Sequence, residues 1–165
     1  MSFPTPGQDP EGQKAVFLTA AIAAVLREEL QDCATVEADQ HGGSPSAGKR
    51  LAVYITPARA GACPVLWIDF GSGIVLEVGA SFGGRWELET TQNDISFLGD
   101  VVRSVVAGRV REVLALGRSA ITVTLGDGTP AREVGYETPH GCLPLPYWRR
   151  WSRGVQYLPY RTEQL

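Results

Sequence analysis

The feature that most constrains the fold is a series of short apolar runs separated by tight, glycine-containing turns. The runs are rich in β-branched and aromatic residues, which is typical of strands. Strands joined by turns this short must be antiparallel, because a parallel pair needs a crossover of about a dozen residues. The first group of runs therefore predicts an antiparallel meander with one solvated face, formed by Leu51–Thr56, Pro64–Phe70, Gly73–Val78 and Arg85–Glu89.

A second group of apolar runs follows nearer the C-terminus. It comprises Arg111–Leu116, Ser119–Leu125 and Ala131–Tyr136, and Asp127-Gly128 between the last two runs is a strong signal for a tight turn. These runs predict a second set of antiparallel strands.

Two segments have helical rather than alternating periodicity. Apolar residues recur at intervals of three and four between Gln13 and Asp32, which predicts a helix with one buried stripe. A second helix is predicted to begin after Thr91, whose capping box with Asp94 precedes another apolar stripe, and to end at Gly108.

Together these patterns predict an α+β fold. We expect a single antiparallel sheet with both helices packed on one face, in the order α-β-β-β-β-α-β-β-β, followed by an irregular C-terminal tail. The 165 residues suit one domain. The proline-rich residues 1–11 are expected to form a flexible leader, and residues 12–165 one domain that includes the tail at 139–165.

The amino-acid composition limits which classes of protein this chain can belong to and where in the cell it is expected. Three cysteines at irregular spacing favour reduced thiols in the cytoplasm, and the N-terminus lacks the basic start and apolar run of a signal peptide. The longest apolar run is far below the roughly 20 residues of a membrane span. A net charge of -3 opposes nucleic-acid binding, and the scarcity of lysine suggests a GC-rich genome such as that of an actinobacterium. We therefore expect neither a membrane nor a nucleic acid as partner.

The C-terminal tail is the predicted partner-binding segment. It combines aromatic rings with arginines, the residue types that dominate binding energy at protein interfaces. The alternative is that the tail wraps the sheet and closes the core. The candidate contact residues are Tyr147, Trp148, Arg149, Arg150, Trp151 and Arg153.

Chemical motifs are scarce elsewhere. The carboxylates of Asp69, Glu77, Glu87 and Glu89 are a secondary set, which either converges as an acid–base pair or lines the solvated sheet face. His140 and Cys142, two positions apart, are too few for a zinc site. No phosphate loop or serine-hydrolase motif occurs, so no metal or cofactor is expected.

A set of short motifs resembles small cytosolic proteins of actinobacteria. The motifs are Gly84-Arg-Trp-Glu-Leu88, Gly117-Arg-Ser, Val123-Thr-Leu-Gly-Asp-Gly-Thr129, Gly135-Tyr-Glu and Gly141-Cys-Leu-Pro-Leu-Pro146. Some of these proteins accompany secreted polymorphic toxins as immunity proteins. The resemblance implies a non-catalytic inhibitor that binds a cognate toxin.

Two other classes of function stay open at this point. The order of helices and strands is also similar to that of type III secretion chaperones, which implies a secretion chaperone or adaptor. A small enzyme that uses the strand carboxylates or Cys142 is the third possibility. An acidic partner surface would suit the tail arginines, and a basic one the strand carboxylates.

Overall fold

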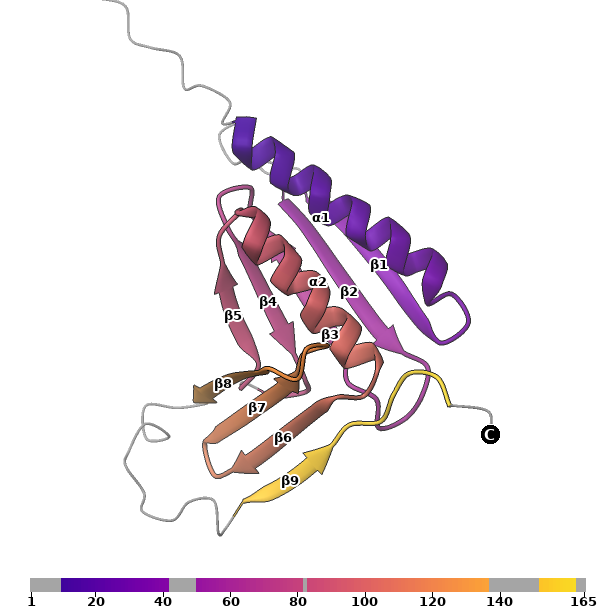
Figure 1. Ribbon diagram of the computed structural model, residues 1–165, viewed down its shortest axis with the longest axis vertical. Coiled ribbons are helices and arrows are strands. Elements are labelled where there is room, and N and C mark those ends of the chain that lie inside the picture. Colours follow the sequence, from indigo (N-terminus) through magenta and orange to yellow (C-terminus); the bar gives the residue numbers. More distant parts are fainter. Residues whose placement is uncertain (1–9, 42–49, 82, 137–151, 163–165) are drawn as a thin grey trace, which may run out of the picture.

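The computed structural model describes residues 10–41, 50–81, 83–136 and 152–162 (Figure 1). Within these ranges the chain forms two α-helices and nine β-strands. In chain order they are α1 (Pro10–Glu29), β1 (Ala34–His41), β2 (Arg50–Pro57), β3 (Val65–Asp69), β4 (Ile74–Val78), β5 (Arg85–Leu88), α2 (Gln92–Val106), β6 (Val110–Ala115), β7 (Arg118–Thr124), β8 (Pro130–Tyr136) and β9 (Arg153–Gln156).

The strands form two antiparallel sheets, so the α+β class is confirmed and the expected single sheet is wrong. The five-stranded sheet has the order β1-β2-β3-β4-β5, in which every strand pairs with its sequence neighbours. The four-stranded sheet has the order β8-β7-β6-β9. β5 and β8, the last strands of their sheets, approach each other without pairing.

The division into two sheets follows from the connection after α2. Gly108 has a φ of 72°, a left-handed conformation that glycine adopts without strain. A Cβ atom at this position would lie 2.4 Å from the backbone nitrogen of Pro159. The turn therefore brings the chain against the C-terminal segment, where Tyr157 donates its N–H to the carbonyl of Val110. β6 consequently pairs with β9 and β7 and starts a new sheet.

Two strands were missing from the predicted order. β1 has the sequence Ala-Thr-Val-Glu-Ala-Asp-Gln-His, in which Val36 is the single large aliphatic residue, and its eight residues all pair with β2. β9 lies within the tail that was expected to be irregular and consists of four residues, Arg-Gly-Val-Gln. In β1, Ala34, Val36 and Ala38 alternate with polar residues, but two of the three are small, and β9 has no alternation; pairing with a partner strand therefore decides the conformation of both segments.

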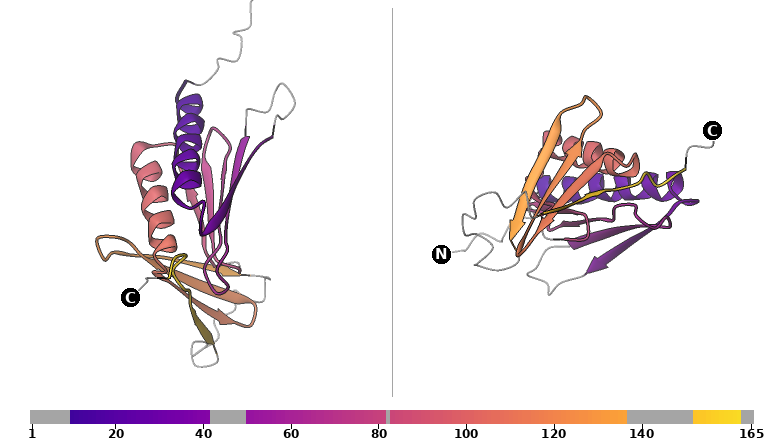
Figure 2. Two further views of the ribbon diagram at one scale, coloured as in Figure 1. Left: turned by 90° about the vertical axis from the view of Figure 1, so that its right-hand side faces the viewer. Right: turned by 90° about the horizontal axis from the view of Figure 1, so that it is seen from below.

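Both helices cover the same side of the five-stranded sheet (Figure 2). α2 starts as expected, because the Thr91 hydroxyl accepts a hydrogen bond from the N–H of Asp94 at 3.2 Å. α1 packs against β1, β2 and β3 of the five-stranded sheet. α2 contacts β7 of the four-stranded sheet. α1 begins at Pro10 and ends at Glu29, about one turn earlier than the periodicity predicted.

One hydrophobic core lies between the helices and both sheets. Trp67 and Leu76 come from the five-stranded sheet, Leu98 from α2 and Ile121 from the four-stranded sheet, and all four are fully buried. The side chains that point toward this core are therefore fixed by packing. Each sheet also has an outer face, directed away from the core, where the residue types are free to differ.

Candidate protein-binding surface

The outer face of the five-stranded sheet carries apolar side chains opposite the helices. Burial alternates along β3, where Val65, Trp67 and Asp69 are buried and Leu66 and Ile68 are half-buried. Cross-strand register then aligns outward residues of neighbouring strands, since Leu66 lies opposite Tyr54 and Ile68 opposite Val75. We call these outward residues the apolar strip: Tyr54, Leu66, Ile68, Phe70 and Val75. Tyr54 and Phe70 are its most exposed members, at 39% and 36%.

Carboxylates border the apolar strip on both sides. On β1, Glu37 lies opposite Tyr54 and is exposed, as is Asp39 two residues further on. On the other side, Glu77 lies opposite Leu66 and Glu87 opposite Val75. An apolar centre with a charged rim is the usual anatomy of a protein interface.

Two arginines partly offset these carboxylates. Arg85 lies between Glu77 and Glu87, with nitrogen–oxygen distances of 3.5 and 3.7 Å. The Arg50 guanidinium lies 5.4 Å from the centre of the Phe70 ring, a cation–π geometry. Because all of these side chains are substantially exposed, the ion pairs contribute little to stability. The described residues of this face still carry more carboxylates than arginines, so the face is acidic.

The four predicted carboxylates do not converge. Glu77 and Glu87 share the outer face, but Asp69 points to the opposite side and is fully buried. There it accepts hydrogen bonds from the Thr19 hydroxyl at 2.6 Å and the Gly71 N–H at 2.8 Å. Glu89 follows the end of β5 and is exposed. The four carboxylates therefore do not gather at one place: Glu77 and Glu87 stay together on the outer face, each near Arg85, and Asp69 has a structural role.

Most of the predicted tail contacts cannot be placed. Tyr147, Trp148, Arg149, Arg150 and Trp151 lie outside the described residues, as do His140 and Cys142. Arg153 is described: it opens β9, lies opposite Leu114 and is exposed. The binding role of the tail thus stays a prediction.

The two described cysteines are buried, free thiols. Burial raises the pKa of Cys63 to about 12; the charge of Glu112 adds to this effect, and a hydrogen bond from the Gly79 backbone opposes it. Glu112 is itself buried and accepts the hydroxyl of Tyr157 at 2.6 Å. Burial likewise raises the pKa of Cys33. At neutral pH both thiols are protonated, which is the wrong state for a nucleophile.

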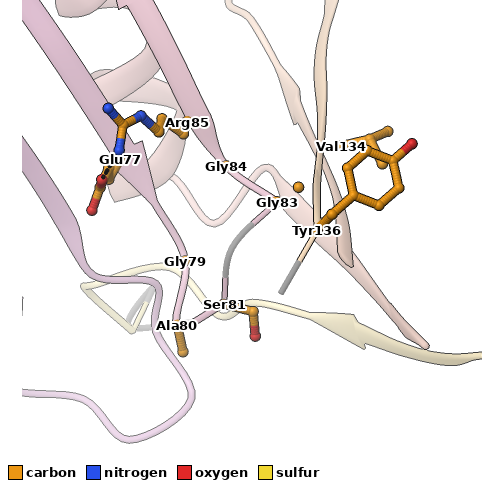
Figure 3. A pocket seen from close by; sticks show the side chains of 10 residues that line it. Glu77, Gly79, Ala80, Ser81, Gly83, Gly84, Arg85, Val134 and Tyr136 are labelled. Carbon is orange, nitrogen blue, oxygen red and sulfur yellow. Dashed lines mark ion pairs between the residues drawn. The ribbon is translucent and has the colours of Figure 1, made fainter. Parts of the chain in front are cut away.

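A cavity of about 610 Å³ lies where the two sheets meet. Figure 3 shows Glu77 and Arg85 on one side and Val134 and Tyr136 of β8 on the other. Between them runs the β4–β5 turn, which contributes Gly79, Ala80, Ser81, Gly83 and Gly84 to the lining. The volume falls within the usual range of binding pockets, roughly 300–1,000 Å³. The cavity therefore joins the acidic face to the outer face of the four-stranded sheet.

Other kinds of site are not evident in the described part of the chain. It contains no group of three or more His, Cys, Asp or Glu side chains that could hold a metal ion. None of its helices is long and apolar enough to cross a membrane.

The apolar strip was missed because alternation marks two faces of a strand without showing which one the helices cover; only the border carboxylates Glu37 and Asp39 were missed because β1 was not predicted. The alternation in Arg50–Pro57 was a usable signal, since every second residue there points outward. Comparison with known proteins adds no assignment: no protein-family model matches the chain, and no curated protein matches it either. The function must therefore be inferred from the surface itself.

Proposed function

We propose that this protein is a non-catalytic immunity protein that binds and neutralises a cognate bacterial toxin in the cytoplasm. The observation that carries the proposal is the apolar strip with its carboxylate border, on the sheet face that both helices leave open. Contiguous exposed apolar groups rimmed by polar residues mark interaction sites on soluble proteins. A folded inhibitor needs such a surface and needs no catalytic group of its own.

The chemistry of this surface suggests the character of the partner. Tyr54 and Phe70 provide large, stiff, exposed contact area, and aromatic side chains of this kind carry much of the binding energy at interfaces. Glu37, Asp39 and Glu87 at the border attract a basic surface and speed its association. A toxin that acts on an anionic substrate such as a nucleic acid presents a basic surface around its active site, which this acidic face would occlude.

The test is capture of the partner. The tagged protein is isolated from its native host and from co-expression with neighbouring genes, and any stoichiometric partner is identified by mass spectrometry. We expect a secreted, multidomain effector at one-to-one stoichiometry, and growth of cells that express its toxic domain should require this protein. Recovery of an unfolded secretion substrate by a dimer would instead indicate a chaperone, and a stable monomer without any partner would contradict both.

A pair of matched variants tests the surface. Tyr54→Lys places a charge in the apolar strip, and we expect affinity to fall at least about tenfold, which corresponds to about 1.4 kcal/mol. Val25→Lys makes the same kind of change at an apolar residue of α1 that is 55% exposed on the helical side. It should leave affinity unchanged. Equal loss in both variants, or none in Tyr54→Lys, would place the interface elsewhere.

A further inference from the structure

The outer face of the four-stranded sheet is strongly basic. Val110 and Glu112 of β6 point into the core and are buried, so Arg111 between them points outward. Cross-strand register places the other outward positions on the same face, and Thr122 lies opposite both Arg111 and Arg132. This surface, which we call the basic face, contains the exposed Arg109, Arg111 and Arg132 and the buried Arg118, and no described strand residue on it is acidic.

Two of these arginines lie on either side of a threonine. Arg111 and Arg132 flank Thr122 across three adjacent strands, so their backbones are two inter-strand spacings, or about 10 Å, apart. Both are exposed, and neither has an ion-pair partner among the described residues. In the next row, Ala120 lies opposite Val134, and both are small or medium apolar residues. Two exposed guanidinium groups with no ion-pair partner among the described residues, beside the exposed Val134, can hold two carboxylates and an apolar side chain.

The cavity provides the apolar anchor point. Val134 and Tyr136, which form one of its walls, are 36% and 47% exposed. The Arg118 guanidinium lies 5.6 Å from the centre of the Tyr136 ring and supports the ring from the sheet side. An aromatic side chain held in this way is a pre-organised contact for an apolar group.

We infer that the basic face binds an acidic, extended segment of the partner, with carboxylates on Arg111 and Arg132 and an apolar side chain in the cavity. The inference rests on the proposed function, because it describes a second contact of the same partner. In an extended chain, side chains two positions apart lie on the same side and about 6.6 Å apart, a separation that two long arginine side chains can span from backbones about 10 Å apart. The partner would thus present a basic surface to one sheet and an acidic segment to the other.

Charge favours a protein segment over a nucleic acid at this face. The basic face is only three to four strands wide, and beyond the cavity the chain presents Glu77 and Glu87. A phosphate backbone long enough to bind well would run onto these carboxylates, and the net charge of -3 opposes it at long range. A folded protein with both signs of charge avoids this conflict.

The experiment measures binding of labelled probes by fluorescence anisotropy. The main probe is a capped peptide with two glutamates two positions apart, on the same side of an extended chain, followed by a phenylalanine. A peptide with lysines in place of the glutamates and an oligothymidine of eight nucleotides serve as the other probes. We expect the glutamate peptide alone to bind, with affinity falling as salt increases. The double variant Arg111→Gln/Arg132→Gln should weaken binding at least about tenfold.

Two further variants separate the contributions. Tyr136→Ala should weaken binding of the glutamate peptide severalfold but leave a peptide without phenylalanine unaffected. Arg103→Gln removes an exposed arginine of α2 that pairs with Asp100, so it matches the charge change at a remote place and should leave binding unchanged. Circular dichroism of each variant checks that the fold is retained.

Each other outcome overturns the inference. Tighter binding of the oligothymidine, lost in the same double variant, would assign the face to nucleic acid. No binding of the glutamate peptide, or equal loss in Arg103→Gln, would leave the face without the inferred role. If the native partner is captured equally well by Arg111→Gln/Arg132→Gln, the inference fails while the proposed function stands. If no partner is captured at all, the proposed function fails irrespective of peptide binding.

Discussion

The two sheets share one core but differ in their outer faces. Toward the core, both contribute fully buried aliphatic residues such as Leu76 and Ile121. Away from it, the five-stranded sheet presents an apolar strip bordered by carboxylates, whereas the four-stranded sheet presents arginines. The difference shows that the requirement for burial acts on one face of each sheet. The other face of each sheet is not constrained by burial. Its charge is opposite on the two sheets, with carboxylates on one and arginines on the other.

The largest expected effect tests whether the two sheets depend on one core. Leu98 of α2 is fully buried, so Leu98→Ala should lower the free energy of unfolding by about 2–5 kcal/mol through lost burial and a residual cavity. Urea denaturation followed by tryptophan fluorescence and by far-ultraviolet circular dichroism should show this loss as one transition. Two separate transitions would mean that the sheets unfold independently and that the comparison concerns two domains.

The second prediction concerns the turn that joins the two faces. A Cβ atom at Gly84 would lie 2.0 Å from the carbonyl oxygen of Val78, which belongs to the backbone and cannot rotate away. Gly84→Ala should therefore destabilise the protein by about 1–3 kcal/mol. Gly126→Ala is the matched control, because nothing lies within 4 Å of its Cβ position. Equal melting temperatures of the two variants would contradict the close packing of this turn.

The third prediction uses the buried groups at the junction. Cys63 lies next to β3 of the five-stranded sheet. The charge of Glu112, which belongs to the four-stranded sheet, helps to raise the pKa of Cys63. The pKa of Cys63 is about 12 in the folded protein and about 9 in the unfolded chain. Below pH 9 both states keep the proton. Between pH 9 and 12 the unfolded chain loses it first, so stability should fall by up to about 1.4 kcal/mol per pH unit.

Comparison of the wild type with Cys63→Ala isolates this effect. The variant is less stable at every pH because it leaves a small cavity, but its stability should change less between pH 8 and pH 10. Burial also raises the pKa of Tyr157, which extends the alkaline loss of stability in both proteins. Parallel curves of unfolding free energy against pH would show that Cys63 does not titrate in this window.

The sequence predicted elements whose signals are local. α2 combines a capping residue, an amphipathic stripe and a terminating glycine, and each acts within a few residues of its position. The strands from β2 to β8 have alternation or turn signals of their own. By contrast, β1 has only a weak pattern of its own and is stabilised by pairing with the next strand, β2, and β9 is stabilised by pairing with β6, much earlier in the chain. The division into two sheets was missed for the same reason, since it depends on contacts between Gly108 and Pro159.

The candidate surface was less predictable than the fold. Glu77 and Glu87 were identified because strand alternation places them on one face, but Asp69 has the same sequence context and is buried beside Thr19. The direction of a side chain depends on which face the helices cover, and that information lies in the packing. Arg111 and Arg132 were overlooked because they are about 20 positions apart and become neighbours through the register of three strands.

The smallest expected effects come from replacing one arginine by glutamine on the outer face of each sheet. Arg85→Gln leaves Glu77 and Glu87 without their shared cation, so at low salt it should destabilise the protein by less than about 1 kcal/mol. Arg132→Gln instead removes one of several like charges and should be neutral or slightly stabilising. High salt screens both interactions, so the difference between the two variants should shrink between 20 mM and 1 M sodium chloride, concentrations at which the screening length falls from roughly 20 to 3 Å. Changes of the same sign that are insensitive to salt would show that the two outer faces do not differ in electrostatic character, and the opposition of charge on which the proposed partner contacts depend would be lost.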